Sequence, residues 1–250
     1  MDSLSQRYER LWPHATVMGP QDETPRLTVV LFHGCGGAGR NIHLFARYAV
    51  SLGLRAVIVD AYGPRGLKRR LAAFLACNGL WLRGYERSGD VLAMLWGLSQ
   101  RPEVDGVVLA GWSHGAWAIM DLMTQGLTRP GEARLSDPDP RWLADVRGLF
   151  LMYPYVNFLA RAKDRSWRTI RPTLMVMALR DHLAGFSLSL KAVRHLRRQG
   201  VPLETVVVDS THAFDELGAD RFGFMKYDPQ SVETVRAAFA EFVSGLKPAQ

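Results

Sequence analysis

A serine framed by glycines is the feature of this sequence best suited to covalent chemistry. Ser113 stands in the string Gly111-Trp112-Ser113-His114-Gly115, which has the G-x-S-x-G spacing of a nucleophilic serine. A short apolar run ends here and a helix-like run begins, so a sharp, strained turn would raise the hydroxyl above the chain. Glycine is expected at the flanking positions because side chains there would collide with neighbouring backbone. The alternative is a serine that caps the helix of an ordinary crossover.

A serine hydroxyl attacks only when a base takes its proton, and seven histidines compete for that role. His212 follows the last expected strand, where a loop can lie over the carboxyl end of a sheet. His114 adjoins Ser113, but neighbouring side chains diverge at such a turn. His33 lies in a glycine-rich turn, to which we assign a different role below. We therefore predict that His212 is the base.

The base in turn needs a carboxylate that fixes its tautomer and stabilises the imidazolium. Asp181 ends the expected strand before that of His212, and the order Ser113, Asp181, His212 accompanies serine turns of this kind. Asp209 is the second candidate, but it lies three residues before His212 on the same strand and is badly placed to reach the ring. Asp60 also ends a strand, yet precedes the serine. The structural alternative for Asp181 is a helix N-cap.

A glycine-rich string after the first strong strand could stabilise the negative oxygen of a tetrahedral intermediate. In residues 32–39, FHGCGGAG, the glycines allow backbone N–H groups to converge. We predict the N–H groups of Cys35 and His114 as the two donors, with Gly36 as the alternative to Cys35. A nucleotide-phosphate loop is the rival interpretation, but the string lacks the lysine of a P-loop and the G-x-G-x-x-G spacing.

The elements that would position these residues alternate between strands and helices. Six short apolar runs predict strands, at 27–34, 55–63, 105–113, 147–155, 172–181 and 203–211. Their apolarity is continuous, which is typical of a parallel sheet covered on both faces; a weaker edge strand is expected near Val17. Amphipathic stretches predict helices at 42–53, 89–100, 116–126, 186–200 and 231–246. This alternation predicts an α/β fold, with a mostly parallel, doubly wound sheet flanked by helices.

The length of 250 residues, 48% of them hydrophobic, fits one α/β domain that needs neither metal nor disulfide for stability. Two excursions, at about 63–87 and 126–146, are expected to shape a pocket. Arg65 could reach an anionic substrate group, although a solvated basic face is the alternative. Trp112 and Phe214 flank the expected site and could form apolar walls, or could belong to the core.

The strings LFHGCGG, GWSHG, ALRD and STHAFDE, spread from about residue 27 onward, together resemble the dienelactone hydrolase family of α/β-hydrolases. The resemblance implies the α/β-hydrolase fold and hydrolysis of a carboxylic ester or lactone without metal or organic cofactor. It also implies Ser113 as nucleophile, His212 as base and Asp181 as the acid that orients it. The family proper has cysteine where this chain has Ser113, which favours a more general esterase.

Two cysteines, Cys35 and Cys77, are too few for a disulfide scaffold. We expect free thiols in apolar surroundings. A thiol nucleophile or a disulfide across the pocket are the alternatives.

The remaining features exclude several classes of function. The net charge of +7 comes mostly from scattered arginines, so no nucleic-acid partner is expected. No apolar run reaches the ~20 residues of a membrane span, and the N-terminus lacks a signal core, so we expect a cytoplasmic protein. The expected partner is a small-molecule ester, lactone or acyl substrate, and a homodimer is left open. An acyltransferase or thioesterase would use the same residues, and a catalytically silent binding protein could share the fold.

Overall fold

A computed structural model describes residues 1–66, 68–77 and 80–246. Within these ranges seven strands form one sheet in the order β1-β3-β2-β4-β5-β6-β7. All neighbouring strands run parallel except β1, which pairs antiparallel with β3. The strands are β1 (Thr16–Met18), β2 (Arg26–Phe32), β3 (Arg55–Val59), β4 (Val104–Trp112), β5 (Val146–Met152), β6 (Thr173–Arg180) and β7 (Leu203–Thr211).

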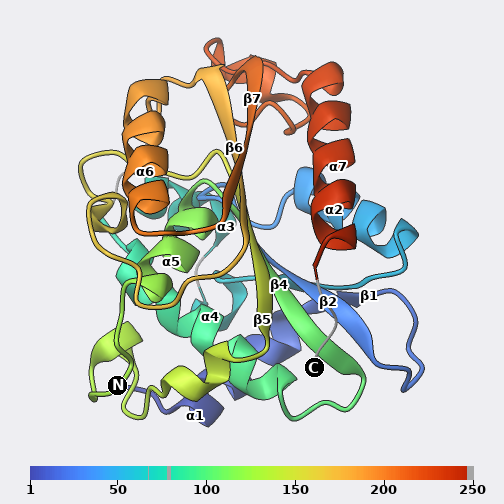
Figure 1. The fold of residues 1–250 in the computed structure, drawn as a ribbon, viewed down its shortest axis with the longest axis vertical. Helices are drawn as coiled ribbons and strands as arrows, with labels where there is room; N and C mark the ends of the chain where they lie inside the picture. Colours follow the sequence, from blue (N-terminus) through green and yellow to red (C-terminus); the bar gives the residue numbers. More distant parts are fainter. Residues whose placement is uncertain (67, 78–79, 247–250) are drawn as a thin grey trace.

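Helices cover both faces of this sheet (Figure 1). The helices are α1 (Leu4–Leu11), α2 (Arg40–Ser51), α3 (Arg69–Cys77), α4 (Gly84–Leu98), α5 (His114–Met123), α6 (Phe186–Arg198) and α7 (Pro229–Ser244). Helices α2 and α7 pack on one face, and α1, α4, α5 and α6 pack on the other. Among the described residues, no helix is long and apolar enough to cross a membrane.

Strand β2 shows why the predicted strands are apolar throughout. Successive side chains of a strand point to opposite faces. Val30 and Phe32 pack into the cluster that contains α4 and α5, whereas Val29 and Leu31 pack into the cluster that contains α2 and α7. All four are fully buried, at 0% exposure. The sheet has no solvent-facing side at this point, which confirms the prediction of a parallel sheet covered on both faces.

The structure confirms the six expected strands, the edge strand near Val17 and the five expected helices, with shifts of a few residues at their ends. It adds two helices that the sequence analysis did not predict. Helix α1 begins with a capping box, in which Ser3 and Gln6 exchange side-chain to backbone hydrogen bonds at 3.0 and 3.1 Å. Helix α3 lies within the excursion expected at 63–87. The excursion at 126–146 contains two short 3-10 turns and an isolated β-bridge between Leu135 and Asp2.

Candidate active site

The chemistry-bearing residues of the sequence lie at one edge of the sheet. Ser113, Asp181 and His212 are each the residue directly after a strand, namely β4, β6 and β7 respectively. These strands run parallel, so their carboxyl ends meet at the same edge. Three residues that are distant in the chain are thereby brought together by the sheet itself.

The turn at Ser113 has the strained geometry expected between β4 and α5. Its φ and ψ are 48° and −107°, a conformation that costs energy for any residue with a side chain. The Ser113 N–H donates to Met152 O at 2.9 Å, which fixes the turn against β5. A Cβ at Gly115 would lie 2.1 Å from Phe32 O, and one at Gly111 would lie 2.5 Å from Ala116 N. The flanking glycines are therefore required by close backbone contacts, as the sequence analysis inferred.

A continuous chain of hydrogen bonds joins the serine to a carboxylate. His212 Nε2 lies 2.9 Å from Ser113 Oγ, and His212 Nδ1 lies 2.7 Å from Asp181 Oδ2. Only 9% of Ser113 and 4% of His212 remain exposed, and such shielding from water strengthens hydrogen bonds.

The second oxygen of Asp181 accepts hydrogen bonds from the backbone N–H groups of Leu183 and Ala184, at 2.9 and 2.8 Å. Burial alone would raise the pKa of Asp181, but the hydrogen bonds from His212 and from this backbone hold it below its ordinary value. An ionised carboxylate only accepts hydrogen bonds, so His212 Nδ1 carries the proton. The lone pair of Nε2 then faces Ser113, which is the arrangement of a general base.

The competing acids and bases are engaged elsewhere. Asp209 forms an ion pair with Arg180 at 3.1 Å, and its side chain is 70% exposed. Asp60 accepts a hydrogen bond from the N–H of Tyr62 at 2.8 Å. The N-cap of α6 is Gly185, so Asp181 is not the helix cap that was its structural alternative.

His33 is held as a neutral ring. Its Nδ1 is 2.6 Å from Gly34 O and must donate, whereas its Nε2 accepts the N–H of Ala61 at 3.1 Å. Burial and the nearby Arg87 lower the pKa of His33 to about 4. His33 is therefore a structural residue of the glycine-rich loop, in agreement with the sequence analysis.

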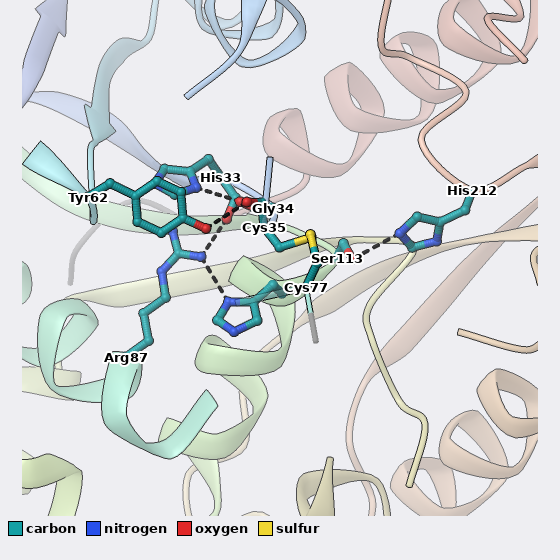
Figure 2. Close-up of a disulfide and its surroundings, with 9 residues drawn as sticks. His33, Gly34, Cys35, Tyr62, Cys77, Arg87, Ser113 and His212 are labelled. Carbon is teal, nitrogen blue, oxygen red and sulfur yellow. Dashed lines mark hydrogen bonds between the residues drawn. A yellow bond between two sulfur atoms is a disulfide. The ribbon is translucent and has the colours of Figure 1, made fainter. Parts of the chain in front are cut away.

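The glycine-rich loop lies against the serine, because a Cβ at Gly34 would be 3.6 Å from Ser113 Cβ. Three successive carbonyls of this loop are fixed by side chains (Figure 2). Arg87 Nη1 donates to His33 O at 2.5 Å, His33 Nδ1 donates to Gly34 O at 2.6 Å, and Tyr62 Oη donates to Cys35 O at 2.7 Å. In a trans peptide the N–H points opposite to the carbonyl. The N–H groups of Cys35 and Gly36 are thus directed away from His33 and Tyr62.

The expectation of free thiols is wrong. Cys35 and Cys77 form a disulfide with their Cα atoms 5.2 Å apart (Figure 2). The bond ties the end of α3 to the glycine-rich loop and leaves no thiol to act as a nucleophile. A disulfide was only the alternative in the sequence analysis, which placed no helix at α3 that would return Cys77 to Cys35.

Three expected substrate contacts have other roles. Arg65 donates to Ala61 O at 2.7 Å and to the buried Asp90 at 2.9 Å, so it belongs to an internal ion network. Trp112 and Phe214 are 1% and 0% exposed and lie in the core beside α2 and α7. Trp112 is the last residue of β4 and adjoins Ser113, but its side chain packs in the core between the sheet and helices α2 and α7.

Sequence reasoning missed a buried acid that supports the site. Asp215 accepts hydrogen bonds from Tyr153 Oη at 2.5 Å, Trp112 Nε1 at 2.7 Å and Asn41 Nδ2 at 3.2 Å. Burial raises the pKa of Asp215, although these three donors oppose the rise. The ring of Tyr153 lies 4.6 Å from that of His212, so the network forms part of the support of the base. The available signal was an acidic residue three positions after His212.

Among the described residues, no group of three or more histidine, cysteine, aspartate or glutamate side chains is arranged to hold a metal ion.

Comparison with known proteins gives matches by structure alone. No model of a known protein family matches the chain, and no curated protein sequence matches it. A dienelactone hydrolase-like promiscuous phosphotriesterase from metagenomic libraries is 17% identical, with a TM-score of 0.65 over 93% of this chain and 92% of that one. Esterase 2 of Thermogutta terrifontis, phosphoramylated by tabun, is 15% identical, with a TM-score of 0.65 over 94% and 91%. Est1E of Butyrivibrio proteoclasticus, with bound ferulic acid, is 13% identical, with a TM-score of 0.63 over 92% and 95%.

These likenesses, together with the sheet order, show that the chain has the α/β-hydrolase fold that its motifs predicted. At such low sequence identity these likenesses establish the fold but not the reaction, which depends on the residues of the site.

Proposed function

We propose that this protein is a serine hydrolase that cleaves a carboxylic ester or lactone through an acyl-enzyme intermediate. The observation that carries the proposal is the chain of hydrogen bonds from Ser113 through His212 to Asp181, at 2.9 and 2.7 Å. The names of structurally similar proteins, an esterase and a dienelactone hydrolase-like phosphotriesterase, add support. So do the sequence motifs that resemble the dienelactone hydrolase family.

In the first half-reaction Ser113 Oγ bonds to the carbonyl carbon of the substrate while its proton passes to His212 Nε2. The carbonyl electron pair moves onto oxygen, and Asp181 stabilises the imidazolium that forms. As the C–O bond to the leaving group breaks, His212 gives its proton to the departing oxygen. Water repeats the sequence on the acyl-enzyme and releases the acid. A lactone follows the same course, except that its alcohol remains attached to the acyl group.

The negative oxygen of the intermediate would accept hydrogen bonds from the backbone N–H groups of Cys35 and His114. The His114 N–H opens helix α5, so the positive end of the helix dipole points at the same place. One such preorganised donor is worth ~3 kcal/mol of activation free energy. The fixed carbonyls of the glycine-rich loop support this assignment, because they hold the Cys35 N–H in a single direction before substrate arrives.

A fluorophosphonate probe tests the proposal, since it forms an adduct only with an activated serine. We expect labelling of Ser113 in the wild type and turnover of p-nitrophenyl esters, both lost in Ser113→Ala and His212→Ala. Ser189→Ala is the matched control, because Ser189 is also buried but lies on α6, outside the hydrogen-bonded chain of Ser113, His212 and Asp181. A folded wild type that is not labelled would instead favour a catalytically silent binding protein.

The leaving group and the acyl acceptor distinguish an esterase from a thioesterase or acyltransferase. Initial rates on matched oxygen esters, lactones and acyl thioesters, with and without an added alcohol as acceptor, separate these reactions. We expect hydrolysis of the oxygen esters or lactones to be the fastest.

A further inference from the structure

One buried arginine joins the two segments that flank the serine. Arg87 lies in the first turn of α4 and is 0% exposed. Its Nη1 donates to His33 O at 2.5 Å (Figure 2). The same Nη1 lies 3.2 Å from Nδ1 of His114. A guanidinium can only donate, so His114 Nδ1 is an acceptor and the ring is neutral. The same nitrogen therefore holds the glycine-rich loop and the start of α5.

The charge of Arg87 has no direct counterion in the part of the chain that the structure describes. No carboxylate lies within ion-pair distance of it there, and its Nε and Nη2 form no hydrogen bond. Asp90, one turn further along α4, is already paired with Arg7 and Arg65 at 2.8 and 2.9 Å. Burial lowers the pKa of Arg87 to about 10, so the group is still cationic at neutral pH. An unpaired buried charge destabilises a fold, and stability alone does not account for it.

Arg55 shows what a structural arginine looks like in the same protein. It is 4% exposed and lies at the start of β3, at the opposite edge of the sheet from Ser113. Its Nε, Nη1 and Nη2 all donate to backbone carbonyls, those of Pro20, Asp22 and Glu103, at 2.6 to 3.2 Å. Arg55 is fully hydrogen-bonded, whereas two of the three nitrogens of Arg87 have no hydrogen-bond partner among the residues that the structure describes. The two residues share burial and carbonyl contacts and differ in their distance from the serine.

We propose that Arg87 is a positioning residue of the oxyanion hole, an inference that rests on the proposed function. Its bond to His33 O fixes the first peptide of the loop that presents the Cys35 N–H. Its contact with the His114 ring fixes the residue whose N–H is the second donor. Behind these donors its desolvated positive charge favours negative charge on the substrate oxygen, because charges interact strongly where water is excluded. Arg87 acts through the backbone and does not touch the substrate.

Arg87→Met tests this role because it keeps the length of the stem and removes the charge and the donors. Arg55→Met is the matched control. The concentration of active sites is measured by titration with the fluorophosphonate probe. Because kcat is then calculated per active site, an unfolded fraction of the sample does not lower it. We expect Arg87→Met to lower kcat by about 30-fold or more with KM changed by less than about threefold, since the interaction strengthens only in the transition state. Arg55→Met should lower the melting temperature and keep kcat per active site.

Affinity for a boronic acid gives a second measurement, which should not change if the role of Arg87 is purely structural. The boronate forms a tetrahedral adduct on Ser113 that resembles the intermediate, whereas the carboxylic acid product does not. We expect Arg87→Met to weaken boronate affinity by about the same factor as kcat, and product affinity by much less.

A kcat per active site within about threefold of the wild type in Arg87→Met would overturn the inference and leave the proposed function standing. Absence of labelling in the wild type would overturn the proposed function itself. If Arg87→Met does not fold, Arg87→Lys decides the matter, because its ammonium sits on a shorter stem and cannot reach both acceptors. We then expect kcat to fall by about tenfold, and an unchanged kcat would refute the role of the guanidinium.

Discussion

Breaking the bond between Cys35 and Cys77 should weaken the fold and loosen the glycine-rich loop together. The disulfide closes a loop across a sequence separation of 42 residues. In the chain-entropy model, opening a loop of this length lowers the free energy of unfolding by about 4 kcal/mol. That is a large share of the about 5–15 kcal/mol by which most domains are stable.

The effect on catalysis should be smaller than the loss of a whole hydrogen-bond donor. Cys35 O is still held by Tyr62 Oη and Gly34 O by His33 when the disulfide is open. A fully lost oxyanion donor lowers kcat by at least about 100-fold, so we expect a partial loss of about tenfold. Stability should therefore respond to the disulfide more than activity does.

Urea unfolding and ester turnover, each with and without a phosphine reductant, measure both effects. The Cys35→Ser/Cys77→Ser double variant serves as control. Its unfolding midpoint and ester turnover should equal those of the reduced wild type and should not change when the reductant is added. Peptide mass spectrometry establishes the redox state of each sample. Equal unfolding midpoints for oxidised wild type and double variant would refute the view that this bond constrains the unfolded chain.

Three further substitutions follow from the site and its surroundings. Asp181→Asn should lower kcat by about 10⁴-fold, because the amide favours the wrong tautomer of His212, while the melting temperature changes little. Asp215→Asn should lower the free energy of unfolding by about 2 kcal/mol in urea, because an amide cannot accept from all three donors. Burial raises the pKa of Asp121 from 3.8 to about 7, so the unfolded chain releases this proton at lower pH than the folded protein. Wild-type stability should therefore fall by up to about 4 kcal/mol as the pH rises from about 4 to about 7. In Asp121→Asn, the free energy of unfolding measured in urea should fall less across the same pH range.

The strands and the residues that follow them could be predicted because they depend on local patterns. Continuous apolar runs mark strands covered on both faces, and Ser113, Asp181 and His212 each come directly after such a run. Parallel pairing then brings the ends of these runs to one edge without further information. The glycine-rich loop could be predicted in the same way, since it follows β2.

The substrate contacts could not be predicted by proximity in sequence. Consecutive residues at the end of a strand point in different directions, so Trp112 enters the core although it adjoins Ser113. Arg65 stands in a basic run, but the buried Asp90 attracts it away from solvent. The disulfide depends on the path of the chain between Cys35 and Cys77, which local patterns do not define.

Arg87 was missed for a different reason, and the sequence did contain a signal for it. An arginine on a helix usually lies at the surface. The stretch GDVLAMLWGL, however, is apolar on nearly every side, and such a helix is buried all round. Two charged residues of that helix, Arg87 in its first turn and Asp90 in its second, are buried with it. The same holds for α5, where all residues from His114 to Met123, Asp121 included, are buried. Because desolvated charges are costly, ionisable residues on such helices are the first places to search for groups that act on a neighbouring site.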